Sequence, residues 1–172
     1  MRVRLLKVVA EDGPDLIQSN LDSRDLHKPW ASPFIDEQGF QRWLEVAGAE
    51  THAGLVARLV KTGEIVGVVN ISQIFMGAFQ SAYLGYYGSI HCAGRGLMTE
   101  AVQTAAHFAF TQLGLHRLEA NIQPGNVRSI ELVRRLGFRK EGFSPKYLKI
   151  AGEWRDHERW AMLADELRDK PR

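Results

Sequence analysis

The chain has 172 residues, of which 45% are hydrophobic, and its formal net charge is only +2. This content is sufficient for one domain with a buried core, and the scattered Lys and Arg residues do not indicate a nucleic-acid or membrane-binding surface. The single cysteine, Cys92, excludes an internal disulfide and a cysteine-rich metal site. Because no apolar run is long enough for a signal peptide or a membrane span, we expect a soluble, cytoplasmic protein.

The first half of the chain is expected to form four strands and two helices. Short apolar runs between turn signals predict the strands, at residues 3–9, 54–60, 65–74 and 81–90. Helical periodicity predicts the helices, at residues 12–21 and 36–48. Pro14 suits the first turn of a helix, and Lys61-Thr62-Gly63 is short enough to close a hairpin between two of the strands.

The second half continues the same alternation. One helical face after Gly96 carries Leu97, Ala101, Ala105, Phe108 and Ala109, and Gly114 is placed to end that helix. Residues 117–123 alternate between apolar and polar side chains, as in a strand with one buried face. A helix at 127–136 and two strands around Ala151-Gly152 complete a single α/β domain over residues 1–172, with a short C-terminal tail.

The segment IHCAGRGLMTEAV, residues 90–102, joins a strand to the long helix. A helix N-terminus offers unpaired N–H groups, and glycines let an anion approach the backbone, although the same residues also suit an ordinary helix entry. A P-loop would need Lys and Ser or Thr after the second glycine. A dinucleotide fingerprint would need a third glycine where Thr99 stands.

Two motifs resemble the GNAT family of N-acetyltransferases. HCAGRGLMTEA (residues 91–101) is similar to the family's acyl-CoA pyrophosphate loop, and NIQPGNVRSIELVRRLGFRKEG (residues 121–142) to the strand, helix and strand that follow. The segments LHKPW, YLGY, GLMTEA and YLKIAGEWRDH resemble the ribosomal-protein alanine N-acetyltransferases of the RimJ and RimL branch, with the RimJ type the better match. The resemblance covers residues 26–163. It implies a twisted mixed sheet of about seven strands, splayed in the middle, with about four helices and acetyl-CoA in the split.

The resemblance also implies a set of cofactor contacts. Backbone N–H groups of the loop would surround the pyrophosphate, and the pantetheine arm would pair with the strand end at Ser89 and Ile90. The expected cofactor-binding residues are Ser89, Ile90, His91, Cys92, Ala93, Gly94, Arg95, Gly96, Leu97, Met98, Asn126 and Ser129. For Arg95 and His91 a solvent-facing position is an equal alternative, since His91 stands where the family usually has Gln or Arg. Cys92 also suits a packing position.

Three residues are candidates for catalysis. By resemblance, Ser129 would protonate the departing CoA thiolate; on spacing alone, Asn126 is an N-cap and Ser129 a first-turn residue. The base positions of related enzymes correspond here to Leu148 and to Asn121, neither of which is a carboxylate. Glu119 lies on the same strand face as Asn121 and could act directly or through water, or could be a solvated strand carboxylate.

The acceptor side is expected to include Trp30, Asn70, Tyr83 and Tyr86, with Trp30 alternatively a buried aromatic residue. The run Asp156-His157-Glu158 does not predict a metal site, because successive strand residues point to opposite faces. The expected activity is direct transfer of acetyl from acetyl-CoA to a primary amine, most simply the N-terminal alanine amine of a ribosomal protein. The alternatives are a small-molecule amine or drug as acceptor, and a non-catalytic CoA-binding or ribosome-binding module.

Overall fold

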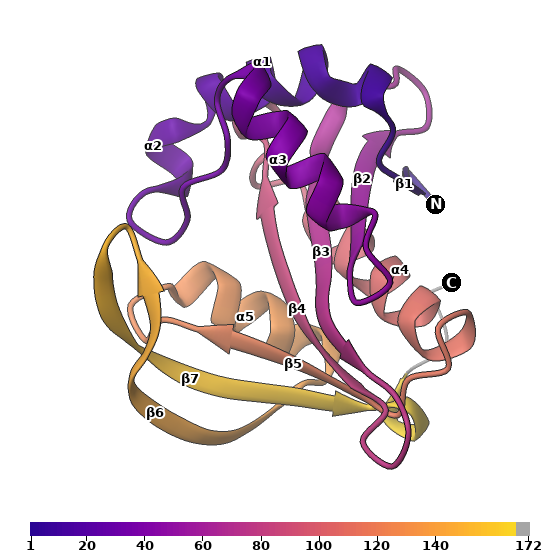
Figure 1. Cartoon of the computed structure of the whole chain (residues 1–172), viewed down its shortest axis with the longest axis vertical. Coiled ribbons are helices and arrows are strands. Elements are labelled where there is room, and N and C mark those ends of the chain that lie inside the picture. The colour runs from indigo at the N-terminus through magenta and orange to yellow at the C-terminus, as the bar shows by residue number, and fades with distance from the viewer. Residues whose placement is uncertain (168–172) are drawn as a thin grey trace.

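Over residues 1–167, the part of the chain that the computed structural model describes, seven strands form one mixed sheet (Figure 1). The strands are β1 (Val3–Lys7), β2 (Ala53–Leu59), β3 (Ile65–Phe75), β4 (Ser81–Gly88), β5 (Arg117–Ile122), β6 (Arg139–Ile150) and β7 (Glu153–Leu163). Their order is β1-β2-β3-β4-β5-β7-β6, and only the β4–β5 pair is parallel. The end of the predicted C-terminal tail lies outside the described residues.

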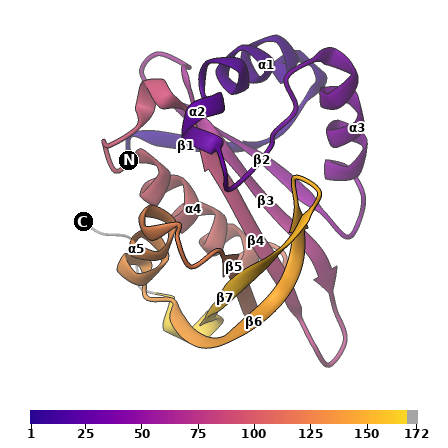
Figure 2. The same ribbon diagram turned by 90° about the vertical axis from the view of Figure 1, so that its left-hand side faces the viewer.

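Helices cover both faces of this sheet. Within the described residues these are α1 (Gly13–Asp22), α2 (Arg24–His27), α3 (Glu37–Ala47), α4 (Leu97–Thr111) and α5 (Val127–Leu136). Figure 2 shows α1, α2 and α3 on one side of the sheet and α4 and α5 on the other. The predicted fold class and strand number are confirmed, with five α-helices in residues 1–167 where about four were expected. The additional helix, α2, has only four residues, too few to show helical periodicity.

Two apolar clusters attach the helices to the sheet. On the α4 and α5 side, Leu97, Ala101, Ala105 and Ala109 are buried, and the small alanines allow α4 to lie close to the strands. On the other side, a smaller cluster of Leu16, Phe40, Val56, Ile65 and Val68 packs α1 and α3 against β2 and β3. Because α1 and α3 pack mainly on β2 and β3, the face formed by β5 and β7 is left more open.

The sheet splits between β4 and β5. These strands pair only from Ser81 with Arg117 to Tyr83 with Glu119, and no later pair joins them within residues 1–167. Beyond this point the strands diverge, as Figure 1 shows. The end of β4 therefore has an edge without a strand partner, and that edge lies beside the start of α4 and the start of α5.

Candidate functional site

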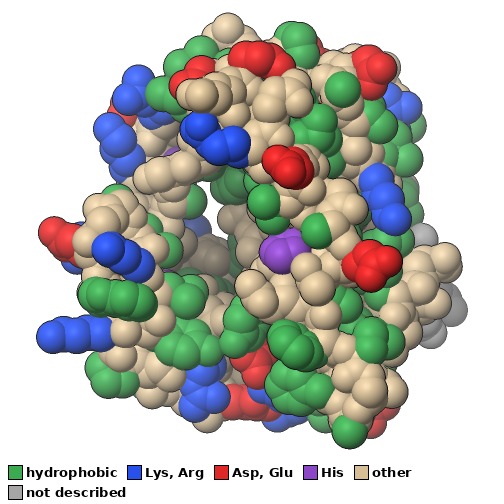
Figure 3. Space-filling model, in the orientation of Figure 1, with side chains coloured by type: hydrophobic (Ala, Val, Ile, Leu, Met, Phe, Trp, Pro, Cys, Tyr) green, Lys and Arg blue, Asp and Glu red, His purple; other side chains and the backbone are tan. Residues whose placement is uncertain are grey.

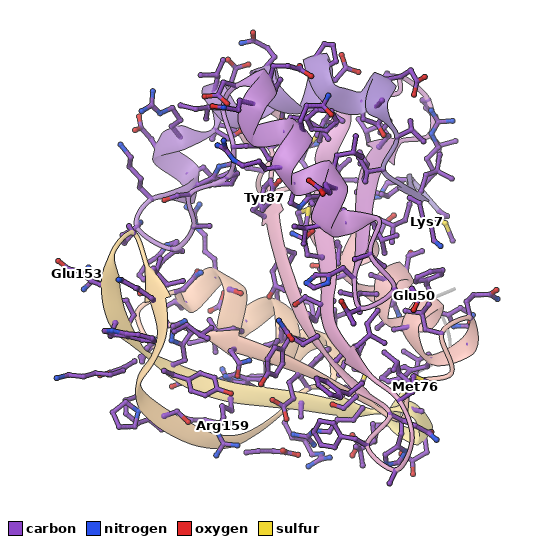
Figure 4. The ribbon with its side chains drawn as sticks, viewed as in Figure 1. Lys7, Glu50, Met76, Tyr87, Glu153 and Arg159 are labelled. Atoms are coloured by element: carbon purple, nitrogen blue, oxygen red, sulfur yellow. The ribbon has the colours of Figure 1, made fainter. Side chains whose placement is uncertain are left out.

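A cleft of about 880 Å³ lies where β4 and β5 diverge. Its walls come from α2 and the connection after it, the end of β4, the start of α4, and α5. Figure 3 shows the hollow between the part of the molecule that carries α1–α3 and the part that carries α5, β6 and β7. In Figure 4, Tyr87 near the end of β4 and Glu153 at the tip of the β6–β7 hairpin lie on opposite sides of this opening.

The charged lining of the cleft suits a ligand with several phosphates. Lys28, Arg128 and Arg135 line it, against Asp25 and Glu131. Arg128 and Arg135 come from α5. Cationic side chains in a concave site attract anions and raise their local concentration.

The predicted phosphate loop turns through two left-handed glycines. Gly94 and Gly96 both have φ of +73°, and Gly96 directly precedes α4 as its N-cap. A Cβ on Gly94 would meet no atom within 4 Å, and on Gly96 it would meet only Arg2 Nη2, at 3.7 Å. The glycines are therefore required by the backbone conformation and not by crowding within the protein. This conformation leaves the first N–H groups of α4 open toward the cleft.

Most of the predicted loop residues line the cleft. They are Ser89, Ile90, Cys92, Ala93, Gly94, Gly96, Leu97 and Met98. The His91 side chain instead meets Asp22, with Nε2 2.9 Å from Oδ2. The carbonyl of Arg95 accepts a hydrogen bond from Arg2 Nη1 at 3.2 Å, and Arg2 also pairs with Glu100 in the first turn of α4. Arg2 and Asp22 thus support the loop from outside the cleft.

Two apolar side chains anchor the loop to the sheet. Cys92 is 4% exposed and belongs to the larger cluster, and burial raises the pKa of its thiol, so it is a packing residue and not an activated nucleophile. Met98 packs on the ends of β3 and β4: a Cβ on Gly67 would lie 2.6 Å from its Sδ, and one on Gly88 3.1 Å from its Cγ. Glycine at these two positions lets the start of α4 approach the strands.

The end of β4 is held by contacts that the sequence did not predict. His27 Nε2 donates to the Gly88 carbonyl at 2.8 Å, and the Ile90 N–H donates to Ser23 Oγ at 3.0 Å. The Ser89 N–H donates to the Val66 carbonyl at 2.9 Å. The N–H groups of Ser89 and Ile90 are therefore already bonded within the protein, and pairing of the pantetheine arm with the backbone of these two residues stays a prediction.

The backbone groups on the open edge of β4 are those of Tyr86 and Gly88. Backbone groups alternate between the two edges of a strand, and the Ser89 N–H points to β3, so Tyr86 and Gly88 face the split. The Gly88 carbonyl is taken by His27, which is 6% exposed. Burial lowers the pKa of His27, so its ring is neutral and carries the proton on Nε2, where the carbonyl accepts it.

The predicted acid, Ser129, is held at the first turn of α5. Asn126 Oδ1 accepts from the Ser129 N–H at 3.3 Å, so Asn126 is the N-cap of α5 as well as a residue of the cleft wall. Ser129 Oγ lies 2.7 Å from Tyr86 Oη, and the Tyr86 hydroxyl also lies 3.3 Å from the Ser129 carbonyl, to which it can donate. Burial raises the pKa of Tyr86 to about 12. Tyr86 packs on the α4 and α5 side of the sheet and lines the cleft, and its role toward the acceptor stays a prediction.

The other catalytic candidates lie on the opposite sheet face. Arg117 donates from Nε and Nη2 to Glu119 Oε1, at 3.0 and 2.9 Å, and also pairs with Glu141. Glu119 is thus a member of an ion-pair network rather than a free carboxylate. Asn121 Oδ1 is buried and has no hydrogen-bond partner within the described part of the chain.

Of the four residues expected on the acceptor side, Trp30 and Tyr86 line the cleft, and Asn70 and Tyr83 do not. Tyr83 Oη lies 3.4 Å from Tyr147 Oη, and Asn70 Oδ1 accepts from Trp43 Nε1 at 3.1 Å. Trp30 lines the cleft and packs on the loop before α5, where a Cβ on Gly125 would lie 3.0 Å from its ring. Trp30 therefore connects the α2 side of the cleft to the α5 side.

Among residues 1–167, no group of three or more His, Cys, Asp or Glu side chains is placed to hold a metal. In the same part of the chain, no helix combines the length and the apolar character needed to cross a membrane.

The fold and the cleft define an α/β protein of the split-sheet type, with a glycine turn and cationic side chains suited to a phosphorylated ligand beside an unpaired strand edge. Comparison with known proteins agrees: residues 2–139 match the family described as acetyltransferase (GNAT) domain, and the chain belongs to this family. It is an acetyl-CoA-dependent N-acetyltransferase.

Relatives of the chain include protein acetyltransferases and less defined enzymes. It is 40% identical to the probable N-acetyltransferase YjcK of Bacillus subtilis over 66% of this chain, and it spans 62% of that relative's length. It is 36% identical to the ribosomal protein uS5-alanine N-acetyltransferase of Escherichia coli, over 79% of this chain and 74% of that protein. It is 29% identical to a methionine sulfoximine and methionine sulfone acetyltransferase of Pseudomonas aeruginosa, over 83% of each chain.

A solved structure with the same fold contains the cofactor. Mycobacterium smegmatis RimJ in complex with CoA-disulfide superposes with a TM-score of 0.88 at 29% identity, covering 98% of this chain and 85% of that one. The family's use of acetyl-CoA agrees with the cleft described above.

Proposed function

We propose that the protein transfers acetyl from acetyl-CoA directly to the N-terminal amine of a cytoplasmic protein, with an N-terminal alanine of a ribosomal protein as the expected acceptor. One observation carries this proposal: the Gly94–Gly96 loop and the Ser129 hydroxyl line the same cleft, beside an unpaired strand edge. The E. coli relative, named for acetylation of a ribosomal-protein alanine, supports the choice of acceptor. The whole chain is proposed to act as one catalytic domain.

The residues of the cleft fit acetyl-CoA in their chemistry. The N–H groups between Cys92 and Met98 suit the pyrophosphate, since a helix N-terminus and a glycine turn favour an anion. The open edge of β4 at Tyr86 and Gly88 suits the amides of the pantetheine arm. The Gly88 N–H, directed to the split, can stabilise negative charge that develops on the thioester oxygen.

The acceptor amine must arrive partly deprotonated. Glu119 is engaged by Arg117, and Asn121 cannot take a proton from an ammonium group. An α-amino group has a pKa of about 7.8 and is roughly one-third neutral at pH 7.5, whereas a lysine of pKa about 10.4 is neutral about one time in a thousand. A site without a strong base therefore favours the α-amine, at an advantage of about 3.5 kcal/mol.

The test compares two peptides of otherwise identical sequence. One has a free N-terminal alanine and no lysine, and the other has a blocked N-terminus and one internal lysine. Release of CoA thiol should be seen with the first peptide alone, at a rate that rises from pH 6.5 to 8.5 as the α-amine deprotonates. A peptide with a blocked N-terminus and no lysine gives the background. Equal rates on the two peptides, or a preference for lysine, would contradict the N-terminal assignment.

A small-molecule amine is the second candidate acceptor. The P. aeruginosa relative is named for acetylation of amino-acid derivatives, and these also carry an α-amine. The same thiol assay with free amino acids and their derivatives distinguishes the two acceptors. Turnover of a free amino acid at a higher kcat/KM than the alanine peptide would favour the small molecule.

A further inference from the structure

A hydrogen bond between two hydroxyls joins the two walls of the split. Tyr86 belongs to β4 and Ser129 to α5, and their oxygens lie 2.7 Å apart. Tyr86 packs against the cluster under α4 and α5, and both residues line the cleft. The sheet itself provides no such link here, because the pairing of β4 with β5 ends at Tyr83 and Glu119.

Tyr86 can be the donor of this hydrogen bond. Tyr86 remains protonated at neutral pH, so it has a proton to donate. Its two acceptors within reach are Ser129 Oγ and the Ser129 carbonyl oxygen. When Tyr86 donates to Oγ, the serine proton is not needed for this contact and can point into the cleft. The Ser129 N–H is occupied by Asn126, so the backbone around Ser129 is fixed as well.

We propose that Tyr86 is a positioning residue for Ser129. Tyr86 directs the serine proton toward the departing sulfur, and after that proton is transferred Tyr86 supplies a new proton to Ser129 Oγ. This inference rests on the function proposed above and on the role of Ser129 in it. As the carbon–sulfur bond breaks, the sulfur keeps the bonding electron pair and takes the proton of Ser129 Oγ. Ser129 Oγ takes the proton of Tyr86 Oη. The acceptor amine loses its proton to water. The Tyr86 phenolate then takes a proton from water, so that no net proton is gained or lost.

The relative acidities of a phenol and an alcohol explain how Tyr86 can assist proton donation by Ser129. A primary alcohol is about as weak an acid as water, whose pKa is about 15.7. Even in its buried position Tyr86 has a pKa of about 12, so a phenolate is less costly to form than a serine alkoxide. A proton relayed from Tyr86 therefore makes the Ser129 hydroxyl a better donor than it would be alone.

The test is a double-mutant cycle on kcat and on KM for acetyl-CoA, with the alanine peptide as acceptor. Tyr86→Phe removes only the hydroxyl and should lower kcat about tenfold, while KM for acetyl-CoA stays within about twofold. Ser129→Ala should lower kcat by up to about 10²-fold, at the lower end of general-acid effects. The double variant should be no slower than Ser129→Ala, because Tyr86 acts only through Ser129.

Thr104→Val is the control for the loss of a hydroxyl outside the cleft. The Thr104 hydroxyl donates to the Glu100 carbonyl at 2.8 Å within α4, and Thr104 does not line the cleft. This variant should retain the kcat of the wild type. Ser129→Thr keeps a hydroxyl, so adding Tyr86→Phe to Ser129→Thr should still lower kcat.

The possible failures are distinguishable. If the wild type releases no thiol with any amine, the proposed function fails, and the role of Tyr86 with it. If the wild type is active and Tyr86→Phe has its kcat, only the role of Tyr86 is overturned. Losses that multiply in the double variant, or a loss seen in KM rather than kcat, would show that Tyr86 merely supports the structure and would equally overturn the inference.

Discussion

Replacing Gly96 by alanine separates the phosphate-binding role of the loop from its backbone conformation. An L-residue with φ of +73° lowers the free energy of unfolding by about 1–2 kcal/mol. A Cβ at this position would meet only Arg2 Nη2, at 3.7 Å. The unliganded protein should therefore fold, with a melting temperature lower by about 2–4 °C for each kcal/mol. In the complex, backbone strain at this turn should displace the loop N–H groups that we propose for the pyrophosphate.

The expected loss of CoA affinity follows from one displaced contact. A hydrogen bond to a charged group contributes about 1.5–3 kcal/mol, which corresponds to about a tenfold to hundredfold rise in Kd. Calorimetric titration of the folded variant with CoA measures this directly.

Gly63→Ala is the control for the loss of stability that an L-residue causes at a positive φ. Gly63, in the β2–β3 turn, has φ of +76° and also has open space around an added Cβ, but it does not line the cleft. The two variants should lose similar stability, and only Gly96→Ala should lose CoA affinity. Equal CoA affinities in the two folded variants would refute the assignment of the loop to the pyrophosphate.

Two further predictions concern Glu119 and His27. Glu119→Gln should change kcat by less than about tenfold, because the carboxylate is bound by two nitrogens of Arg117; a loss in the range of about 10²–10⁴ would instead identify Glu119 as the base. Burial holds the pKa of His27 below its usual 6.5, so the unfolded chain binds the proton more readily and stability falls as the pH drops below about 6.5. His27→Gln keeps a donor for the Gly88 carbonyl and should lose less stability than the wild type between pH 7 and 5 in urea unfolding; parallel losses would contradict this reading.

The fold was predictable where a pattern lies within one segment. The helix predicted at 127–136 has the bounds Val127–Leu136, because Asn126 caps it, Gly137 ends it with φ of +98°, and both signals are local. In β5 the alternation of Leu118, Ala120 and Ile122 with polar residues matches the observed burial. The short helix α2 has no such pattern.

The site was predictable only in part, because several of its contacts join residues far apart in the chain. His27 and Gly88 are 61 positions apart, and Ser23 and Ile90 are 67 apart, so no local spacing indicates either contact. The direction of Tyr86 did have a signal. Tyr83 and Tyr86 are three residues apart in one strand, and an odd spacing places two side chains on opposite faces.

The supports around the end of β4 explain how a split sheet can present a fixed edge to a ligand. A strand end without a partner on one side is free to fray, and ordering it on binding would reduce affinity. Here β3 binds it through Ser89, α2 through the His27–Gly88 hydrogen bond, and α5 through Tyr86 and Ser129. These three contacts come from three different elements. None of them uses the Gly88 N–H, which therefore stays directed to the split. The unpaired edge is therefore ordered before acetyl-CoA arrives, and the groups that remain open on it are those that an amide-rich ligand can use.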